Sequence, residues 1–135
     1  MYTHEKKQFA MNTNLDNQNW LDTVFPASRT DAFFDALFGG AEEGAYDIRL
    51  VCRRIEPEHL EMAFELHQRP NKCLRCNLTY GLPDVFKRHP VLDVKGVAET
   101  LAKEAGWKAM HWHLGHTEEE SSECHSIPFS IYKDA

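Results

Sequence analysis

The chain has 135 residues, of which 42% are hydrophobic and 11% aromatic, and this is enough for one domain with a buried core. The same composition excludes a chain that is disordered throughout. The formal net charge of −6 argues against nucleic acid as the main partner, because binding to phosphates needs a basic surface.

No window of the sequence reaches the roughly 18 apolar residues of a membrane helix, and the first ten residues lack the apolar centre of a signal peptide. We therefore expect a cytoplasmic protein that does not bind membranes. In that compartment the four cysteines are expected to be thiols or metal ligands and not a disulfide framework. Met11 is a second candidate start of translation.

Residues 1–26 are polar and rich in asparagine, which predicts a mobile tail. The apolar segment from Trp20 to Phe25 is expected to dock on the core as a short hook. A single folded domain is expected over residues 27–135. Its first helix is predicted to begin at a capping box, with an acid at Asp31 three residues after Ser28, and to end at Gly39-Gly40.

Two runs with alternating apolar and polar residues come next, from Tyr46 to Arg53 and from Met62 to Arg69. The segment Glu56–His59 between them has the composition of a turn. This pattern predicts an antiparallel hairpin with one buried and one solvated face. Cys52 falls on the buried face and is expected to behave as a small apolar side chain.

Two helices are predicted after the hairpin. The first is short, because Pro83 suits an opening turn and Pro90 stops the helix. In the second, from Asp93 to Gly106, apolar residues recur at helical spacing. Gly96 within its first turn indicates close packing against a neighbour.

Two further strands are predicted from Trp107 to Leu114 and from Ser126 to Tyr132. Pro128 has no N–H to give to a ladder, so we expect the last strand to be an edge strand or bulged. The order α-β-β-α-α-β-β favours an α+β fold, with a four-stranded, mostly antiparallel sheet and helices packed on one face. An exposed edge strand would allow self-association.

The segment Pro70–Pro90 contains the closest cysteine pair, Cys73 and Cys76. Two thiolates at this spacing can both bind one zinc ion, but they supply only half of a tetrahedral site. The remaining ligands would come from the hairpin 107–125, whose His111 and His113 share one face of a strand. Two thiols without a ligand and a redox pair are the alternatives.

The same segment is basic within an acidic protein, which makes it the predicted surface for a protein partner. The residues of this predicted binding surface are Arg69, Lys72, Arg75, Tyr80, Lys87 and Arg88.

His111, His113 and Glu118, together with Gly106, resemble the first motif of the cupins, in which two histidines and a glutamate bind iron, manganese or zinc. The resemblance implies a small metal-dependent enzyme. It covers only this motif, because no second motif follows and the chain has too few strands for a cupin barrel. The solvated face of a half-buried strand accounts for the two histidines by itself and is the favoured interpretation.

From the sequence we therefore expect a non-catalytic binding module, self-associating or bound to a protein partner, with its surface around Pro70–Pro90. The alternative is a zinc-binding domain that uses Cys73 and Cys76 with ligands from residues 107–125. A metal-dependent enzyme using His111, His113 and Glu118 is the third hypothesis.

Overall fold

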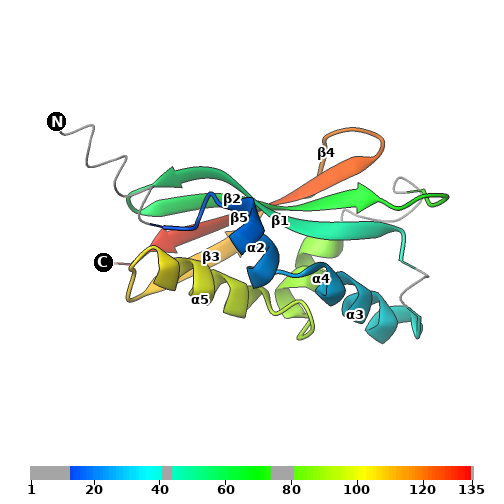
Figure 1. Cartoon of the computed structure of the whole chain (residues 1–135), viewed down its shortest axis with the longest axis horizontal. Coiled ribbons are helices and arrows are strands. Elements are labelled where there is room, and N and C mark those ends of the chain that lie inside the picture. Colours follow the sequence, from blue (N-terminus) through cyan, green and yellow to red (C-terminus); the bar gives the residue numbers. More distant parts are fainter. Residues whose placement is uncertain (1–12, 41–43, 74–80, 135) are drawn as a thin grey trace.

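An antiparallel sheet forms one layer of the molecule, and helices pack against one of its faces (Figure 1). The computed structural model describes residues 13–40, 44–73 and 81–134. The predicted α+β class, with antiparallel strands and helices on one face, is confirmed. The elements in chain order are α2 (Gln18–Val24), α3 (Ala27–Phe38), β1 (Tyr46–Glu56), β2 (His59–Gln68), α4 (Leu82–Arg88), α5 (Val94–Glu104), β3 (Met110–Leu114), β4 (Glu118–Glu119) and β5 (Cys124–Lys133).

The hairpin of β1 and β2 has the predicted turn and faces. Tyr46 lies opposite Gln68, and Glu56 lies opposite His59 at the turn. Ile48 and Leu50 are buried beneath the sheet, whereas the alternating polar residues lie on its other face. The register shifts between Cys52 and Arg54, so β1 carries a bulge that the alternation did not predict.

The position of β5 corrects the prediction drawn from Pro128. The strand order is β1-β2-β5-β3, so β5 is central and not an edge strand. The Pro128 carbonyl accepts a hydrogen bond from the N–H of Gly115, just after β3 has ended and before β4 begins. In an antiparallel ladder the N–H and C=O of one residue point to the same side. The N–H that proline lacks would therefore face this gap between two partner strands.

The helix boundaries agree with the predicted stop signals better than with the start signals. Gly39 ends α3 in the left-handed conformation, at φ 77°. The N-cap of α3, however, is Pro26, and no side chain caps it, so the predicted capping box at Ser28 is wrong. Helix α5 has the expected cap, because the Asp93 carboxylate accepts a hydrogen bond from the N–H of Gly96.

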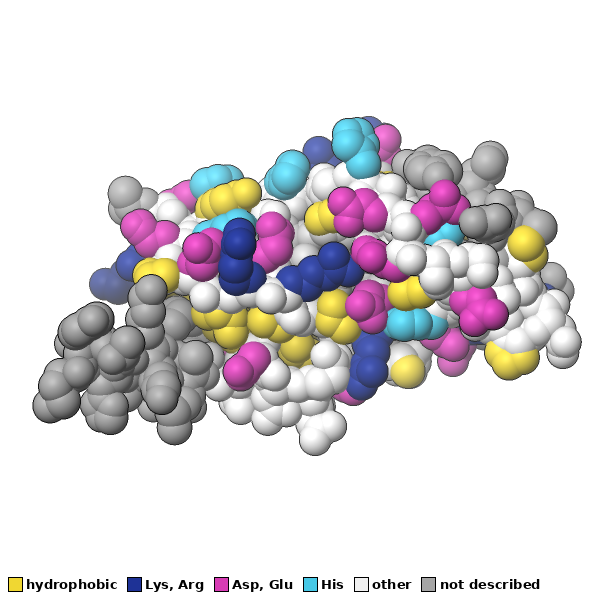
Figure 2. Space-filling model, turned by 90° about the horizontal axis from the view of Figure 1, so that it is seen from above, with side chains coloured by type: hydrophobic (Ala, Val, Ile, Leu, Met, Phe, Trp, Pro, Cys, Tyr) yellow, Lys and Arg dark blue, Asp and Glu magenta, His cyan; other side chains and the backbone are white. Residues whose placement is uncertain are grey.

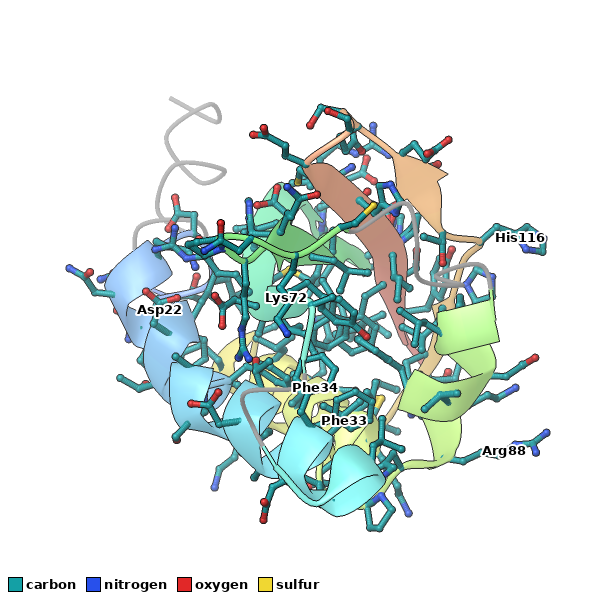
Figure 3. All side chains as sticks on the ribbon, turned by 90° about the vertical axis from the view of Figure 1, so that its right-hand side faces the viewer. Asp22, Phe33, Phe34, Lys72, Arg88 and His116 are labelled. Carbon is teal, nitrogen blue, oxygen red and sulfur yellow. The ribbon has the colours of Figure 1, made fainter. Side chains whose placement is uncertain are left out.

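The core lies between the sheet and the helices. Figure 3 shows Phe33 and Phe34 pointing from α3 into this interior. Phe33 contacts Phe86 of α4, and Phe86 in turn contacts Phe64 of β2. The segment expected to dock as a hook forms α2, and its Leu21 is buried. No helix of the described residues is long and apolar enough to cross a membrane.

Candidate metal site on the open face of the sheet

Among the described residues no helix packs on the second face of the sheet, which we call the open face. Figure 2 shows this face, where histidine, acidic and basic side chains are interspersed. Side chains at alternate positions of β2 and β5 point to it, because strand residues alternate between faces. The residues that carry these side chains are His59, Glu61, Ala63, Glu65 and His67 on β2 and Cys124, Ser126, Pro128, Ser130 and Tyr132 on β5.

Three potential metal ligands meet at one end of the open face. Glu65 and His67 are two residues apart on β2, and Cys124 lies directly opposite His67 on β5. One ligand atom from each of the three lies within 4.8 Å of the other two. The His67 Nε2 and Glu65 Oε1 atoms are 2.9 Å apart. The register between β2 and β5 therefore brings a carboxylate, an imidazole and a thiol close together.

A positive charge already lies beside these ligands. Arg53 is the extra residue at the β1 bulge, and its Nη2 atom is 4.0 Å from Glu65 Oε2 and 3.5 Å from Glu120 Oε1. Glu120 is held in place by the Ser126 hydroxyl, which donates a hydrogen bond of 2.8 Å to it. Two carboxylates therefore share one cation, and Glu120 is a candidate for a fourth ligand.

The thiol of Cys124 is kept neutral by its surroundings. Partial burial raises its pKa, and the negative charges of Glu65 and Glu120 raise it further, while Arg53 acts in the opposite direction. A divalent cation at this place would favour the thiolate, which is the form that binds metals.

A second group of titratable side chains lies at the opposite end of the open face. The Tyr132 ring stacks between His59 and His111, with ring centroids 4.5 and 5.1 Å apart. Each histidine has a carboxylate partner: Glu56 is 3.2 Å from the Nδ1 atom of His59, and Asp134 is 2.6 Å from that of His111. The stacked rings keep the two histidines from meeting at one ion.

The structure places the sequence-predicted metal ligands in separate regions. His111 lies opposite Tyr132, eight residues along β5 from Cys124, which is about 26 Å of extended strand. His113 lies opposite Ser130. Cys73 follows the Gln68 end of β2, away from His111. It is disulfide-bonded, so the expectation of a thiol or metal ligand is wrong for this cysteine. Cys76 lies outside the described residues.

Glu118 does not join the two histidines of the cupin-like motif. It lies on β4 opposite Ser126, whereas His113 lies opposite Ser130, about 13 Å further along β5. The three side chains therefore do not form a site within one chain.

The predicted basic binding surface is not assembled among the described residues. Arg69 is only 16% exposed and binds Asp31 and Asp47 at 2.8 and 2.9 Å, so it ties the end of β2 to α3 and β1. Lys72 is exposed beyond β2, whereas Lys87 and Arg88 are exposed in the last turn of α4. Figure 3 shows Arg88 pointing away from the molecule. Arg75 and Tyr80 lie outside the described residues.

Sequence reasoning did not find the group of Glu65, His67 and Cys124. The alternation had placed Glu65 and His67 together on the solvated face of their strand. Cys124 lies in the hairpin 107–125, which was expected to supply ligands to Cys73 and Cys76, and the pairing of β2 with β5 was not predicted. The register between those two strands was the missing information.

Comparison with known proteins gives no family for this chain. No protein family's sequence profile matches it, and no curated protein matches it significantly. One solved structure with a partial likeness is described as an oxygen-binding H-NOX domain related to soluble guanylate cyclases. The identity is 14% and the TM-score 0.34, over 87% of this chain and 54% of the other.

Proposed function

We propose that this protein is a metal-binding domain that takes up a zinc ion through Glu65, His67 and Cys124. The observation that supports this proposal is the approach of three different ligand atoms to within 4.8 Å of one another. One ion can contact all three once the side chains close to about 3.5 Å from one another, because Zn²⁺ binds sulfur at about 2.3 Å and nitrogen or oxygen at about 2.0–2.2 Å.

The ligand types favour zinc over harder cations. Magnesium and calcium prefer oxygen ligands alone, whereas a thiolate with an imidazole suits zinc. Three protein ligands leave one tetrahedral position for water or for Glu120. Because the three ligands lie on two rigid paired strands, the site would need little rearrangement to close around the ion.

Arg53 gives the proposal a distinctive test. Its guanidinium occupies the space between Glu65 and Glu120 and competes with any other cation there. Removing its charge should therefore strengthen zinc binding, while removing a ligand weakens it. General damage to the fold would not produce both effects.

The experiment is a competition titration with a coloured zinc chelator, performed on the reduced full-length protein. We expect His67→Ala and Cys124→Ser each to weaken zinc binding by more than about tenfold, since even loss of an outer-shell partner typically costs that much. Arg53→Gln should tighten binding by up to about fivefold, the range for losing one exposed charge.

Two matched controls separate this site from the alternatives. His116→Ala removes an exposed histidine from the connection between β3 and β4 and should leave zinc affinity unchanged. The double variant Cys73→Ser/Cys76→Ser should also retain the metal. Loss of zinc from that double variant, with full binding by Cys124→Ser, would move the site to the cysteine pair and overturn the proposal.

A further inference from the structure

The two edges of the main sheet are treated differently. At the β1 edge, Gln18 donates a hydrogen bond of 2.8 Å to the Leu50 carbonyl. The Thr30 hydroxyl accepts one of 3.2 Å from the N–H of Ile48. Side chains of α2 and α3 thus occupy backbone groups that another strand would need, which is how proteins block edge pairing.

At the β3 edge, no described residue forms such a cover. Gly115 and Ala109 bond to β5 through their backbone groups, so in the alternating ladder Met110, Trp112 and Leu114 turn theirs outward. Among the described residues no side chain or loop makes a hydrogen bond to these outward groups. The outward backbone groups of β3 can therefore form hydrogen bonds with another strand.

The sequence of β3 suits pairing with a copy of itself. It reads Met-His-Trp-His-Leu, which is nearly the same in both directions about Trp112. In an antiparallel pair centred on Trp112, each histidine faces a histidine of the other copy, and Met110 faces Leu114. In a dimer with its two-fold axis at Trp112, the outward N–H and C=O groups of each copy form hydrogen bonds with those of the other copy.

We propose that two copies of this chain join β3 to β3, and that His111 and His113 of both copies form a second zinc site on the open face. In this register His111 and the opposing His113 are a non-hydrogen-bonded pair, with Cα atoms about 4.5 Å apart, the closer of the two spacings. Four imidazoles then surround the two-fold axis, whereas one chain offers only two.

Asp134 supports the role of His111 as a ligand. Its carboxylate is 2.6 Å from Nδ1 of His111, which leaves Nε2 for the metal. Metal-binding histidines usually have such a carboxylate on the second ring nitrogen, because it orients the ring and strengthens the ligand. A five-residue strand buries little surface, so pairing should depend on the metal that the histidines hold.

The test uses full-length protein with His67→Ala and Cys124→Ser in every sample, so that the site of the proposed function is absent and the two proposals fail separately. Sedimentation velocity is measured over a concentration series with zinc chloride and with a chelator. We expect zinc to lower the dimer dissociation constant by about tenfold or more, with one ion per two chains. Monomer in zinc at every concentration would overturn the proposal.

Two further variants test the edge and the ligands. Met110→Pro removes an outward N–H that β5 does not use, so its monomer should fold and its dimer should be lost. Met110→Ala keeps that N–H and is the matched control. His111→Ala/His113→Ala should abolish the response to zinc. A zinc-induced dimer in either Met110→Pro or the histidine double variant contradicts this arrangement.

Discussion

At the scale of single residues, the cap of α5 explains a glycine that helix propensity disfavours. A Cβ atom on Gly96 would lie 2.2 Å from Oδ2 of Asp93, the carboxylate that caps the helix. The sequence predicted close packing at Gly96, and the structure identifies the neighbour as the cap itself.

A double-mutant cycle can test this explanation. Gly96→Ala alone should change the free energy of unfolding little, because about 1 kcal/mol of helix propensity offsets about 1 kcal/mol of lost capping. In an Asp93→Ala background the same substitution should stabilise by about 1 kcal/mol. Denaturant unfolding measures both values. Equal effects of Gly96→Ala in the two backgrounds would show that a Cβ atom at position 96 does not disturb the capping carboxylate.

Cys52 allows a second residue-scale prediction, on pH dependence. Burial raises the pKa of its thiol from 9.0 to about 11. The neutral thiol is the favoured form in the folded state, so its contribution to stability is complete below pH 9 and is lost as the pH rises through 11. Near pH 8 the folded protein should hold about a hundredfold less Cys52 thiolate than the unfolded chain.

Alkylation by iodoacetamide, followed by peptide mass spectrometry, measures this difference. The rate at Cys52 should reach half of its maximum near pH 11 in the native protein and near pH 9 in denaturant. Limited access alone would lower the native rate without moving its pH dependence. A native profile that levels off with the denatured one would therefore contradict a raised pKa.

At the scale of elements, local sequence patterns predicted the features that depend on residues close together in the sequence. The β1–β2 hairpin and α5 followed from alternation, helical spacing and the Asp93 and Gly106 boundary signals. The central place of β5 did not follow, because Pro128 is tolerated only through a gap between two other strands. The candidate metal site was missed for the same reason: His67 and Cys124 meet through strand order, which one sequence does not display.

The contact between α3 and the β1 edge leads to an element-scale prediction. Thr30 is fully buried and accepts the hydrogen bond of the Ile48 N–H. Thr30→Val keeps the shape but leaves this N–H without a partner, which should cost about 1–3 kcal/mol of unfolding free energy. Thr23→Val, an exposed position on α2, should change it by less than about 0.5 kcal/mol. Equal, small effects in thermal and denaturant unfolding would show that the Thr30 hydroxyl does not cap the strand.

At the scale of the whole molecule, one face of the sheet forms the core and the other carries the titratable side chains. The covered face holds the apolar residues that stabilise the domain, among them Phe64 and Phe129, which stack at 5.1 Å. The open face therefore needs no apolar side chains, and histidine, cysteine and carboxylate groups can stand together there without weakening the core. Both proposed zinc sites use this face, at its opposite ends.

The covered face also depends on the segment before α3, which the sequence predicted to be a tail with a docking hook at Trp20–Phe25. Leu15, Leu21 and Phe25 are 0%, 1% and 2% exposed. Burying three such side chains contributes about 5–9 kcal/mol, comparable with the whole stability of a small domain, about 5–15 kcal/mol. A chain that starts at Ala27 should therefore lose its cooperative thermal transition, whereas one that starts at Met11 retains all three side chains and should keep it. Circular dichroism during heating distinguishes the two, and a cooperative transition in the chain starting at Ala27 would show that residues 27–134 form the domain alone.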